Sequence, residues 1–273
     1  MCFTVADHAH NLRASFAVSA NKPVGVITRG TTNTNRLRRC DRWMVNHPAV
    51  VAALNSTSTP LAVDVGYGAS HTTTCEWARY LRTVNPAVDV LGLEIDPARV
   101  LPPRDGVRFG LGGFELAGHA PQVVRAFNVL RQYDVSQVED AWAVVCERLA
   151  PGGVFVEGTC DELGRRSCWV LLDASGPVSL TLAWSPWHSQ RPSQLAERLP
   201  KALIHRNVPG EPIHELLSAA DQAWDRAAGY ATFGPRARWF EARRMLVEQG
   251  VPLAPQRRLL RDSLLTVPWD FVA

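Results

Sequence analysis

The sequence predicts an α/β fold with a mostly parallel sheet, helices on both faces and an antiparallel hairpin at its end. Two observations lead to this prediction: the apolar run 61–65 ends in a glycine-rich bend, and a second apolar run, 88–94, follows after a helical pattern. Further short apolar runs alternate with helical patterns up to residue 158. Such alternation favours parallel strands joined by right-handed crossovers.

The core elements follow in chain order. Strands are expected at 61–65, 88–94, 107–110, 123–129 and 153–158, and helices at about 72–84 and 136–149. The segments 167–173 and 178–184 are joined by Ala174-Ser175-Gly176-Pro177, a sequence typical of a turn. These two segments form the predicted hairpin.

Helical additions flank the predicted core of residues 61–190. Residues 1–60 are expected to form an N-terminal cap with helices at 36–46 and 49–54, and residues 191–273 a helical C-terminal extension packed on the core. Helical patterns in the extension cover 194–199, 213–228 and 239–248. We expect no second independent domain.

Composition is that of an ordinary globular protein, with 46% hydrophobic and 20% charged residues in 273. No apolar stretch approaches the length of a membrane span, and the N-terminus lacks the order of a secretory signal, so a cytoplasmic location is expected. The six cysteines form no Cys-x-x-Cys pair, and no histidine cluster has ligand spacing. We therefore expect reduced thiols and no metal.

Charge is distributed unevenly along the chain, although the net charge is only +3. Residues 1–60 carry seven basic and two acidic side chains, and so do residues 235–261. Arginine-rich flanks suit an anionic substrate or nucleic acid. They are equally consistent with solvated helix faces that pair with the acidic middle of the chain.

The bend after the first strand has the chemistry of a nucleotide-binding turn. Gly66 and Gly68 allow positive φ and a close approach of the main chain to a ligand. A dinucleotide site would require a glycine at His71, and a phosphate-binding loop would require Gly-Lys-Ser/Thr. A purely structural turn is the remaining alternative.

Four motifs in order resemble those of the class I, Rossmann-like S-adenosylmethionine-dependent methyltransferases. They are Asp64-x-Gly66-x-Gly68-x-Ser70, Glu94 at the end of the second strand, Phe127-Asn128-Val129-Leu130, and Ala150-Pro151-Gly152-Gly153. The third glycine of the first motif is replaced by Ser70, which can still cap a helix. The resemblance covers about residues 61–160.

The resemblance implies S-adenosylmethionine as the cofactor and assigns roles to matching residues. Asp64 would orient the turn and the amino-acid part of the donor, Glu94 would bind the ribose, and Ile95 would lie against the adenine. The other residues expected to bind the cofactor are Gly66, Tyr67, Gly68, Ser70, Gly113, Phe114, Asn128 and Val129. Phe114 is equally consistent with a core aromatic residue, and Asn128 with a buried amide that satisfies local backbone.

Residues outside these motifs complete the expected site. Arg29 or Arg36 would grip the donor carboxylate, although ordinary helix-start chemistry also accounts for this segment. Glu157 and Tyr133 are the candidate catalytic residues, because they follow the carboxyl ends of central strands, where ligands bind in open α/β sheets. A structural salt bridge is an equally good explanation of Glu157.

The expected function is therefore methyl transfer by in-line displacement, an enzymatic activity with a small-molecule acceptor. RNA methylation is the alternative within the enzyme class, because of the arginine-rich flanks. A donor-binding regulatory protein without catalysis is the alternative outside it. The acceptor atom and the oligomeric state are not indicated by the sequence.

Overall fold

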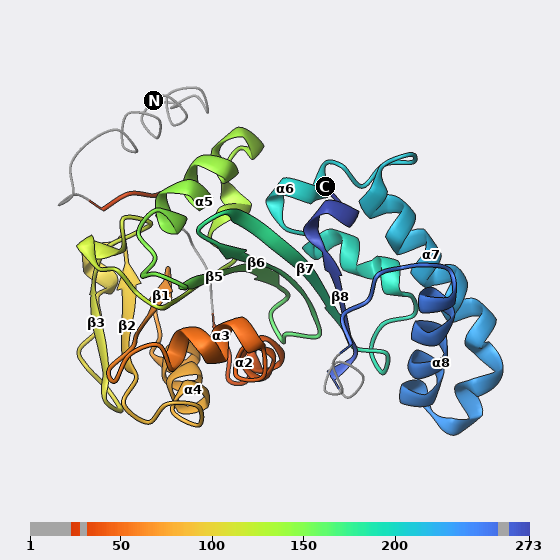
Figure 1. Ribbon diagram of the computed structural model, residues 1–273, viewed down its shortest axis with the longest axis horizontal. Coiled ribbons are helices and arrows are strands. Elements are labelled where there is room, and N and C mark those ends of the chain that lie inside the picture. The colour runs from red at the N-terminus through yellow and green to blue at the C-terminus, as the bar shows by residue number, and fades with distance from the viewer. Residues whose placement is uncertain (1–22, 28–31, 256–261) are drawn as a thin grey trace. The chain divides into compact units, whose positions relative to one another are not determined.

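The structure, a computed structural model that describes residues 23–27, 32–255 and 262–273, confirms the predicted α/β class. Its strands form an eight-stranded sheet in the order β3-β2-β1-β4-β5-β6-β7-β8 (Figure 1). The strands are β1 (Leu61–Val65), β2 (Asp89–Glu94), β3 (Val107–Leu111), β4 (Val123–Phe127), β5 (Val154–Cys160), β6 (Arg166–Asp173), β7 (Gly176–Trp184) and β8 (Leu264–Pro268). The helices are α2 (Arg38–Met44), α3 (Pro48–Leu54), α4 (Thr72–Leu81), α5 (Val138–Cys146), α6 (Lys201–Ile204), α7 (Pro212–Arg226) and α8 (Pro235–Glu248).

The described residues group into two compact units. Unit 1 contains the chain up to Val156 together with Leu172–Gly176, and unit 2 contains Glu157–Leu171 and Pro177–Ala273. The three-part division at residues 60 and 190 stays a prediction from the sequence. The two units are described separately below.

Unit 1 contains the parallel strands that the sequence predicts. β1 pairs in parallel with β2 and with β4, and β2 pairs in parallel with β3. In this register Asp64 lies opposite Gly92 on one side and Arg125 on the other. The predicted strand 123–129 ends two residues early, at Phe127, because Asn128 takes a φ of 62° that no strand accommodates.

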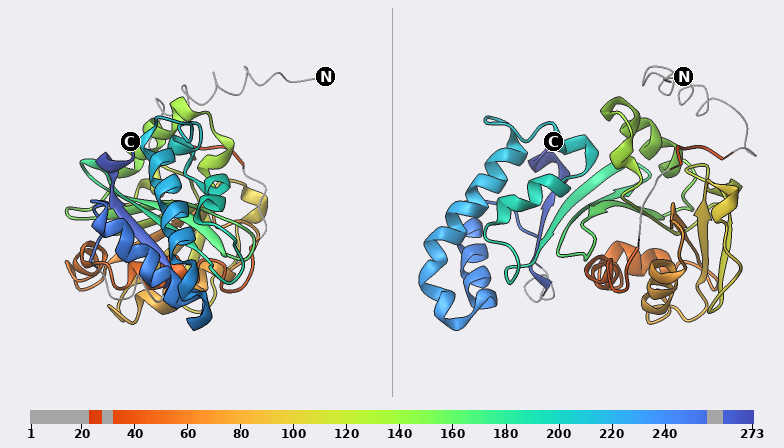
Figure 2. Two further views of the ribbon diagram at one scale, coloured as in Figure 1. Left: turned by 90° about the vertical axis from the view of Figure 1, so that its right-hand side faces the viewer. Right: turned by 180° about the vertical axis from the view of Figure 1, so that it is seen from behind.

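Helical spacing accounts for the helices of unit 1. In α4 the side chains of Thr74, Trp77, Ala78 and Leu81 are buried at intervals of three and four residues. A capping box between Asp134 and Gln137 precedes α5. In Figures 1 and 2, α2, α3 and α4 lie together at one side of this unit, and α5 lies away from them.

A buried cluster of charges joins the strands of unit 1 to its helices. The Arg125 guanidinium, on β4, donates to the Asp64 carboxylate at 2.6 and 3.0 Å and to the Asp41 carboxylate, on α2, at 2.6 Å. It also donates to the Thr73 carbonyl, and it lies 4.5 Å from the centre of the Trp77 ring. All three charged side chains are almost fully buried. Groups from three other elements, β1, α2 and α4, therefore converge on one guanidinium of β4.

Burial and ion pairing shift the pKa values of Asp41 and Arg125 in opposite directions. Burial raises the pKa of Asp41 to about 7, although Arg125 lowers it. For Arg125, burial alone would lower the pKa, but the carboxylates of Asp64 and Asp41 raise it overall. Two acids share one guanidinium, so the second acid retains its proton more easily than an exposed aspartate.

Unit 2 combines antiparallel strands with helices. β7 and β8 pair antiparallel, and the Thr181 and Thr266 hydroxyls are 2.8 Å apart across the pair. The sequence predicts only helices after residue 190, so β8 is an addition. The short segment Leu264–Pro268 becomes recognisable as a strand only through its pairing with β7.

Aromatic rings pack the helices of unit 2 against its strands. The Trp184 ring, at the end of β7, lies edge-on to Trp224 of α7 and to Trp239 of α8, with centroid distances of 4.9 and 5.2 Å. Arg238 stacks over Trp224 at 3.9 Å and donates to the Trp224 carbonyl. This packing gives the C-terminal helices a core of their own.

We predict that Arg125→Met destabilises the protein by about 3–5 kcal/mol, because it leaves two buried carboxyl groups without their cation. The matched control is Arg108→Met, which removes an exposed arginine on β3 paired with Asp89 and is expected to cost less than about 1 kcal/mol. Urea unfolding monitored by tryptophan fluorescence measures both. Equal losses in the two variants would contradict the importance of the buried cluster.

Candidate functional site

The glycine bend after β1 is shaped by two left-handed residues. Gly66 has a φ of 69° and Gly68 a φ of 80°. The Gly66 N–H donates to the Leu93 carbonyl at 2.7 Å, which fixes the bend beside the end of β2. A Cβ atom at Gly66 would lie only 2.7 Å from Cγ2 of Val129. The bend therefore requires glycine for its conformation and for its packing.

Glu94 ends β2 with a buried carboxylate that faces this bend. Its Oε2 accepts the Gly68 N–H at 3.0 Å, and its Oε1 accepts the Ile95 N–H at 2.9 Å. The side chain is 1% exposed. Oε1 also accepts the Asp96 N–H at 3.4 Å, so the three bonds orient the carboxylate and leave a lone pair of Oε2 available.

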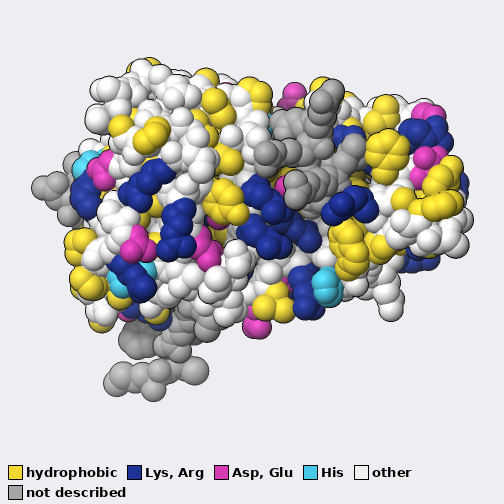
Figure 3. Space-filling model, turned by 90° about the horizontal axis from the view of Figure 1, so that it is seen from below, with side chains coloured by type: hydrophobic (Ala, Val, Ile, Leu, Met, Phe, Trp, Pro, Cys, Tyr) yellow, Lys and Arg dark blue, Asp and Glu magenta, His cyan; other side chains and the backbone are white. Residues whose placement is uncertain are grey.

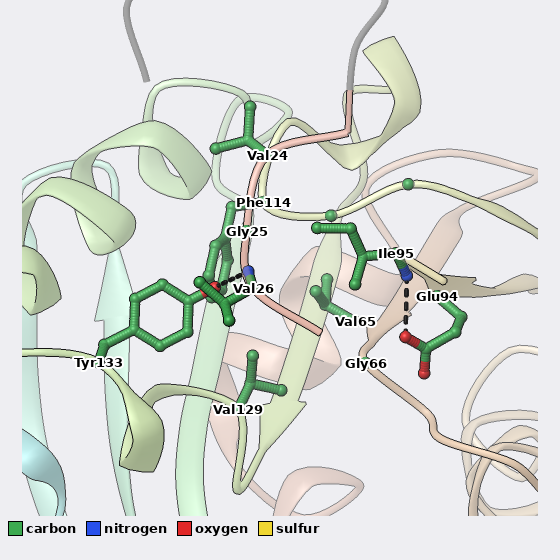
Figure 4. Close-up of a pocket in the computed structure, with 12 residues that line it drawn as sticks. Val24, Gly25, Val26, Val65, Gly66, Glu94, Ile95, Phe114, Val129 and Tyr133 are labelled. Atoms are coloured by element: carbon green, nitrogen blue, oxygen red, sulfur yellow. Dashed lines mark hydrogen bonds between the residues drawn. The ribbon is translucent and has the colours of Figure 1, made fainter. Parts of the chain in front are cut away.

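A cavity of about 270 Å³, including its part open to solvent, lies beside these groups. Figure 4 shows Glu94 and Ile95 on one side and Tyr133 and Phe114 on the other. Predicted site residues that line it are Gly66, Glu94, Ile95, Gly113, Phe114, Val129 and Tyr133. An apolar hollow with few polar groups has the usual character of a small-molecule site.

Five further lining residues were not predicted: Val24, Gly25, Val26, Val65 and Gly112. Three of them belong to the segment Pro23–Ile27, which we call the strap. The strap crosses the middle of the cavity (Figure 4). It has no periodic pattern and is far from the motifs in sequence, so only the glycine between two valines could have drawn attention to it.

Hydrogen bonds of the main chain hold the strap in place. The Val24 N–H donates to Glu115 Oε2 at 2.6 Å, and the Val24 carbonyl accepts the Phe114 N–H at 2.9 Å. The Val26 N–H donates to the Tyr133 hydroxyl at 2.6 Å. Gly113 allows this approach, since a Cβ there would lie 2.1 Å from the Val24 carbonyl oxygen.

Other predicted cofactor residues support the turn from outside the cavity lining. Asp64 is bound by Arg125 and accepts the Thr74 hydroxyl at 2.8 Å. The Tyr67 hydroxyl bonds to the Arg99 carbonyl and the Leu101 N–H, and its ring contacts Phe109 edge-on. Of the other residues predicted to bind the cofactor, Ser70 has its hydroxyl 2.8 Å from that of Thr72, and Asn128 directly follows β4. Arg36 is half-buried, and Arg29 lies outside the described residues.

The two candidate catalytic residues belong to different units. Tyr133 lines the cavity in unit 1, and burial raises the pKa of its phenol to about 12. Glu157, on β5 in unit 2, is fully buried, and neither carboxyl oxygen has a hydrogen-bond partner among the described residues. Burial raises the pKa of Glu157 to about 8. At neutral pH both groups therefore carry their protons.

The described part of the chain contains neither a metal-binding group nor a membrane-spanning helix. No set of three or more histidine, cysteine or acidic side chains in the described ranges could hold a metal ion. No helix among those residues is long and apolar enough to cross a membrane. The cysteines that the structure describes, namely Cys40, Cys75, Cys146, Cys160 and Cys168, are buried free thiols.

Comparison with known proteins gave matches among solved structures alone. No protein-family model matches the chain, and no curated protein matches it. Magnesium protoporphyrin IX methyltransferase from Synechocystis PCC 6803 aligns with 50% of this chain and 67% of its own, at 15% identity and a TM-score of 0.32. The CcbJ methyltransferase from Streptomyces caelestis aligns with 57% and 73%, at 19% identity and a TM-score of 0.35.

A third similar structure is the sugar N-methyltransferase KedS8 from Streptoalloteichus sp. ATCC 53650. It aligns with 60% of this chain and 75% of its own, at 15% identity and a TM-score of 0.33. These are distant likenesses. The functional proposal below therefore rests on the residues of the site.

We predict that Gly66→Ala costs more stability than Gly118→Ala, its matched control. Both glycines have φ near 70°, but a Cβ at Gly118 would meet open space. Each variant should lose about 1–2 kcal/mol to left-handed strain, and Gly66→Ala a further 1–3 kcal/mol, roughly, to overpacking against Val129. Urea unfolding measures the difference. Adding Val129→Ala should recover part of the excess loss, and no recovery would contradict the contact.

We predict that Glu157→Gln removes a pH dependence of stability. The pKa of Glu157 is raised from 4.5 to about 8 in the folded protein, so its stabilising contribution is complete below pH 4.5 and is lost as pH rises through 8. Between pH 5 and pH 9 the wild type should lose at least about 1 kcal/mol more than the variant. Urea unfolding at both pH values tests this, with Glu162→Gln as the exposed control. Parallel pH profiles would overturn it.

Proposed function

We propose that the chain is an S-adenosylmethionine-dependent methyltransferase that acts on a small molecule. The observation that carries the proposal is the Glu94 carboxylate, buried at the end of β2, oriented by the Gly68 and Ile95 N–H groups and lining an apolar cavity. A carboxylate at this place suits the two hydroxyls of a ribose. The resemblance of the four sequence motifs supports the same family.

The residues present fit the donor. Because Gly66 has no Cβ, the turn lies directly against Val129, and both residues line the cavity. Ile95, Phe114 and Val129 supply the apolar walls that an adenine requires, and Glu94 faces the sugar. The donor, when bound, supplies a methyl group on a sulfonium, which is transferred by in-line displacement.

The protein's own part in such a reaction is alignment and exclusion of water. An apolar cavity holds the reacting groups in one geometry, and this contributes most of the acceleration in a displacement that needs no covalent intermediate. In this proposal Asp64 is a positioning residue. Its oxygens are engaged by Arg125 and Thr74, so it acts on the donor through the turn that follows it.

Glu157 is proposed to serve the acceptor. A buried carboxyl group with two unpartnered oxygens can hold an amine or a hydroxyl of a substrate. Because its pKa is raised to about 8, it would donate a hydrogen bond at neutral pH and accept a proton only in alkaline conditions. Tyr133 is proposed to act as a hydrogen-bonding group rather than as a base, since burial raises its pKa to about 12.

RNA methylation receives less support from the arginines of the C-terminal flank. Those that the structure describes contact the protein itself: Arg238 and Arg243 donate to carbonyls, Arg244 pairs with Glu241 and Glu248, and Arg236 lies over the Trp187 ring. On the face shown in Figure 3, several basic side chains gather near the middle, and basic, acidic and hydrophobic side chains are mixed elsewhere. A small-molecule acceptor therefore remains our proposal.

Calorimetry with S-adenosylmethionine, S-adenosylhomocysteine and NAD⁺ tests cofactor choice. We expect the first two to bind and NAD⁺ to give no heat. Transfer of a labelled methyl group into a cell extract then separates an enzyme from a donor-binding regulatory protein. Donor binding without any labelled product would favour the regulatory alternative, and binding of NAD⁺ alone would refute the proposal.

We predict that Glu94→Gln weakens binding of S-adenosylhomocysteine by about ten- to a hundredfold, because hydrogen bonds to a charged acceptor are replaced by weaker ones to an amide. Asp89→Asn is the matched control, since Asp89 is an exposed acid at the other end of β2. Titration calorimetry on folded protein measures both. Equal dissociation constants for Glu94→Gln and the wild type would rule out the assigned role.

A further inference from the structure

A donor and an acceptor of hydrogen bonds lie side by side in the turn after β3, in which Gly113 and Phe114 line the cavity. The donor is the Phe114 N–H, and the acceptor is the Glu115 carboxylate. Glu115 is 3% exposed, and its Oε1 accepts the Gly113 N–H at 2.8 Å. Its Oε2 accepts a hydrogen bond from the segment that packs against Gly113.

In this structure the main chain of Val24 occupies that pair. The Val24 carbonyl accepts from the Phe114 N–H at 2.9 Å, and the Val24 N–H donates to Glu115 Oε2 at 2.6 Å. The Watson–Crick edge of an adenine offers the same two functions, a ring nitrogen that accepts and an amino group that donates. Val24 thus satisfies the groups that an adenine would use.

We propose that the strap, Pro23–Ile27, is an internal occupant of the adenine subsite and that the donor binds by displacing it. This inference rests on the proposed function, and it adds that the strap competes with the donor for the adenine subsite. The strap and an adenine cannot share the subsite, because the same Phe114 N–H and Glu115 oxygen serve both.

Packing supports competition between strap and donor. The strap lies in the middle of the cavity, which measures about 270 Å³ including its part open to solvent. The Gly25 backbone is close to both walls, since a Cβ there would lie 3.0 Å from the Tyr133 hydroxyl and 3.2 Å from Ile95 Cδ1. Figure 4 shows the strap passing between these two side chains.

The strap is held by contacts that can be given up. Val24 is its buried hydrophobic side chain, whereas Ile27 is 50% exposed. The remaining anchor is the bond from the Val26 N–H to the Tyr133 hydroxyl. If the strap closes the subsite in most molecules, the apparent dissociation constant of the donor equals the intrinsic constant divided by the open fraction, so it is raised. Weakening an anchor must then tighten binding.

Calorimetry of the full-length protein with S-adenosylhomocysteine tests this competition. Tyr133→Phe removes the acceptor of the Val26 N–H, and Val26→Pro removes the donor. We expect both variants to bind about three- to tenfold more tightly than the wild type, the factor that one neutral hydrogen bond supports. Ile27→Ala, which alters an exposed strap residue and leaves the anchors in place, should match the wild type. Unchanged or weaker binding in both anchor variants would overturn the proposal.

Hydrogen exchange of the amides of Val24–Ile27 provides an independent readout. Saturation of the wild type with S-adenosylhomocysteine should speed their exchange if the ligand displaces the strap. Slower exchange would show a strap that closes over the ligand and would reject displacement. Failure of the proposed function is distinguishable, because neither the wild type nor any variant would then bind the nucleoside. Binding that is insensitive to the strap would leave the proposed function intact and refute this inference alone.

Discussion

One buried guanidinium organises the part of the molecule that contains the site. Arg125 joins β4 to β1 through Asp64 and to α2 through Asp41, while α4 contributes the Thr73 carbonyl and the Trp77 ring. An unpaired charge at this depth would be very unfavourable, so these elements are held in one arrangement. Asp64 is followed at once by Val65 and the glycine bend. The geometry of the bend therefore depends on the ion pair between Arg125 and Asp64, which lies two residues before Gly66.

The same cluster changes the meaning of the first motif. An acid before a glycine turn suggests a residue that touches the ligand, yet the Asp64 carboxylate is bound by Arg125 and Thr74. Glu94 is the acid that reaches the cavity. Two acids near the ends of neighbouring strands thus have different tasks, one in the framework and one at the cavity. Which acid has which task is decided by the residue opposite it in the sheet.

The cavity itself is made from segments far apart in the chain. The ends of β1 and β2 supply the bend and the carboxylate, the turn after β3 supplies Gly113 and Phe114, and the strap covers them from the N-terminal side. Glycine at position 113 is what allows a main chain to approach so closely. A peptide group and an adenine edge present similar hydrogen-bonding functions, and the proposed competition between the strap and the donor rests on this similarity.

The sequence by itself determined the α/β class and the order in which the parallel strands and their connecting helices follow along the chain. It also determined several residues at the strand ends that gather around the cavity. These features follow from local periodicity and from glycine and acidic residues at fixed spacing, which act over a few neighbours. Only the tertiary structure decided the pairing of Arg125 with Asp41 and Asp64, the strand β8 and the course of the strap. Each of these depends on contacts between residues tens of positions apart. Such contacts are selected by burial and by hydrogen-bond satisfaction in the folded chain, which no local pattern records.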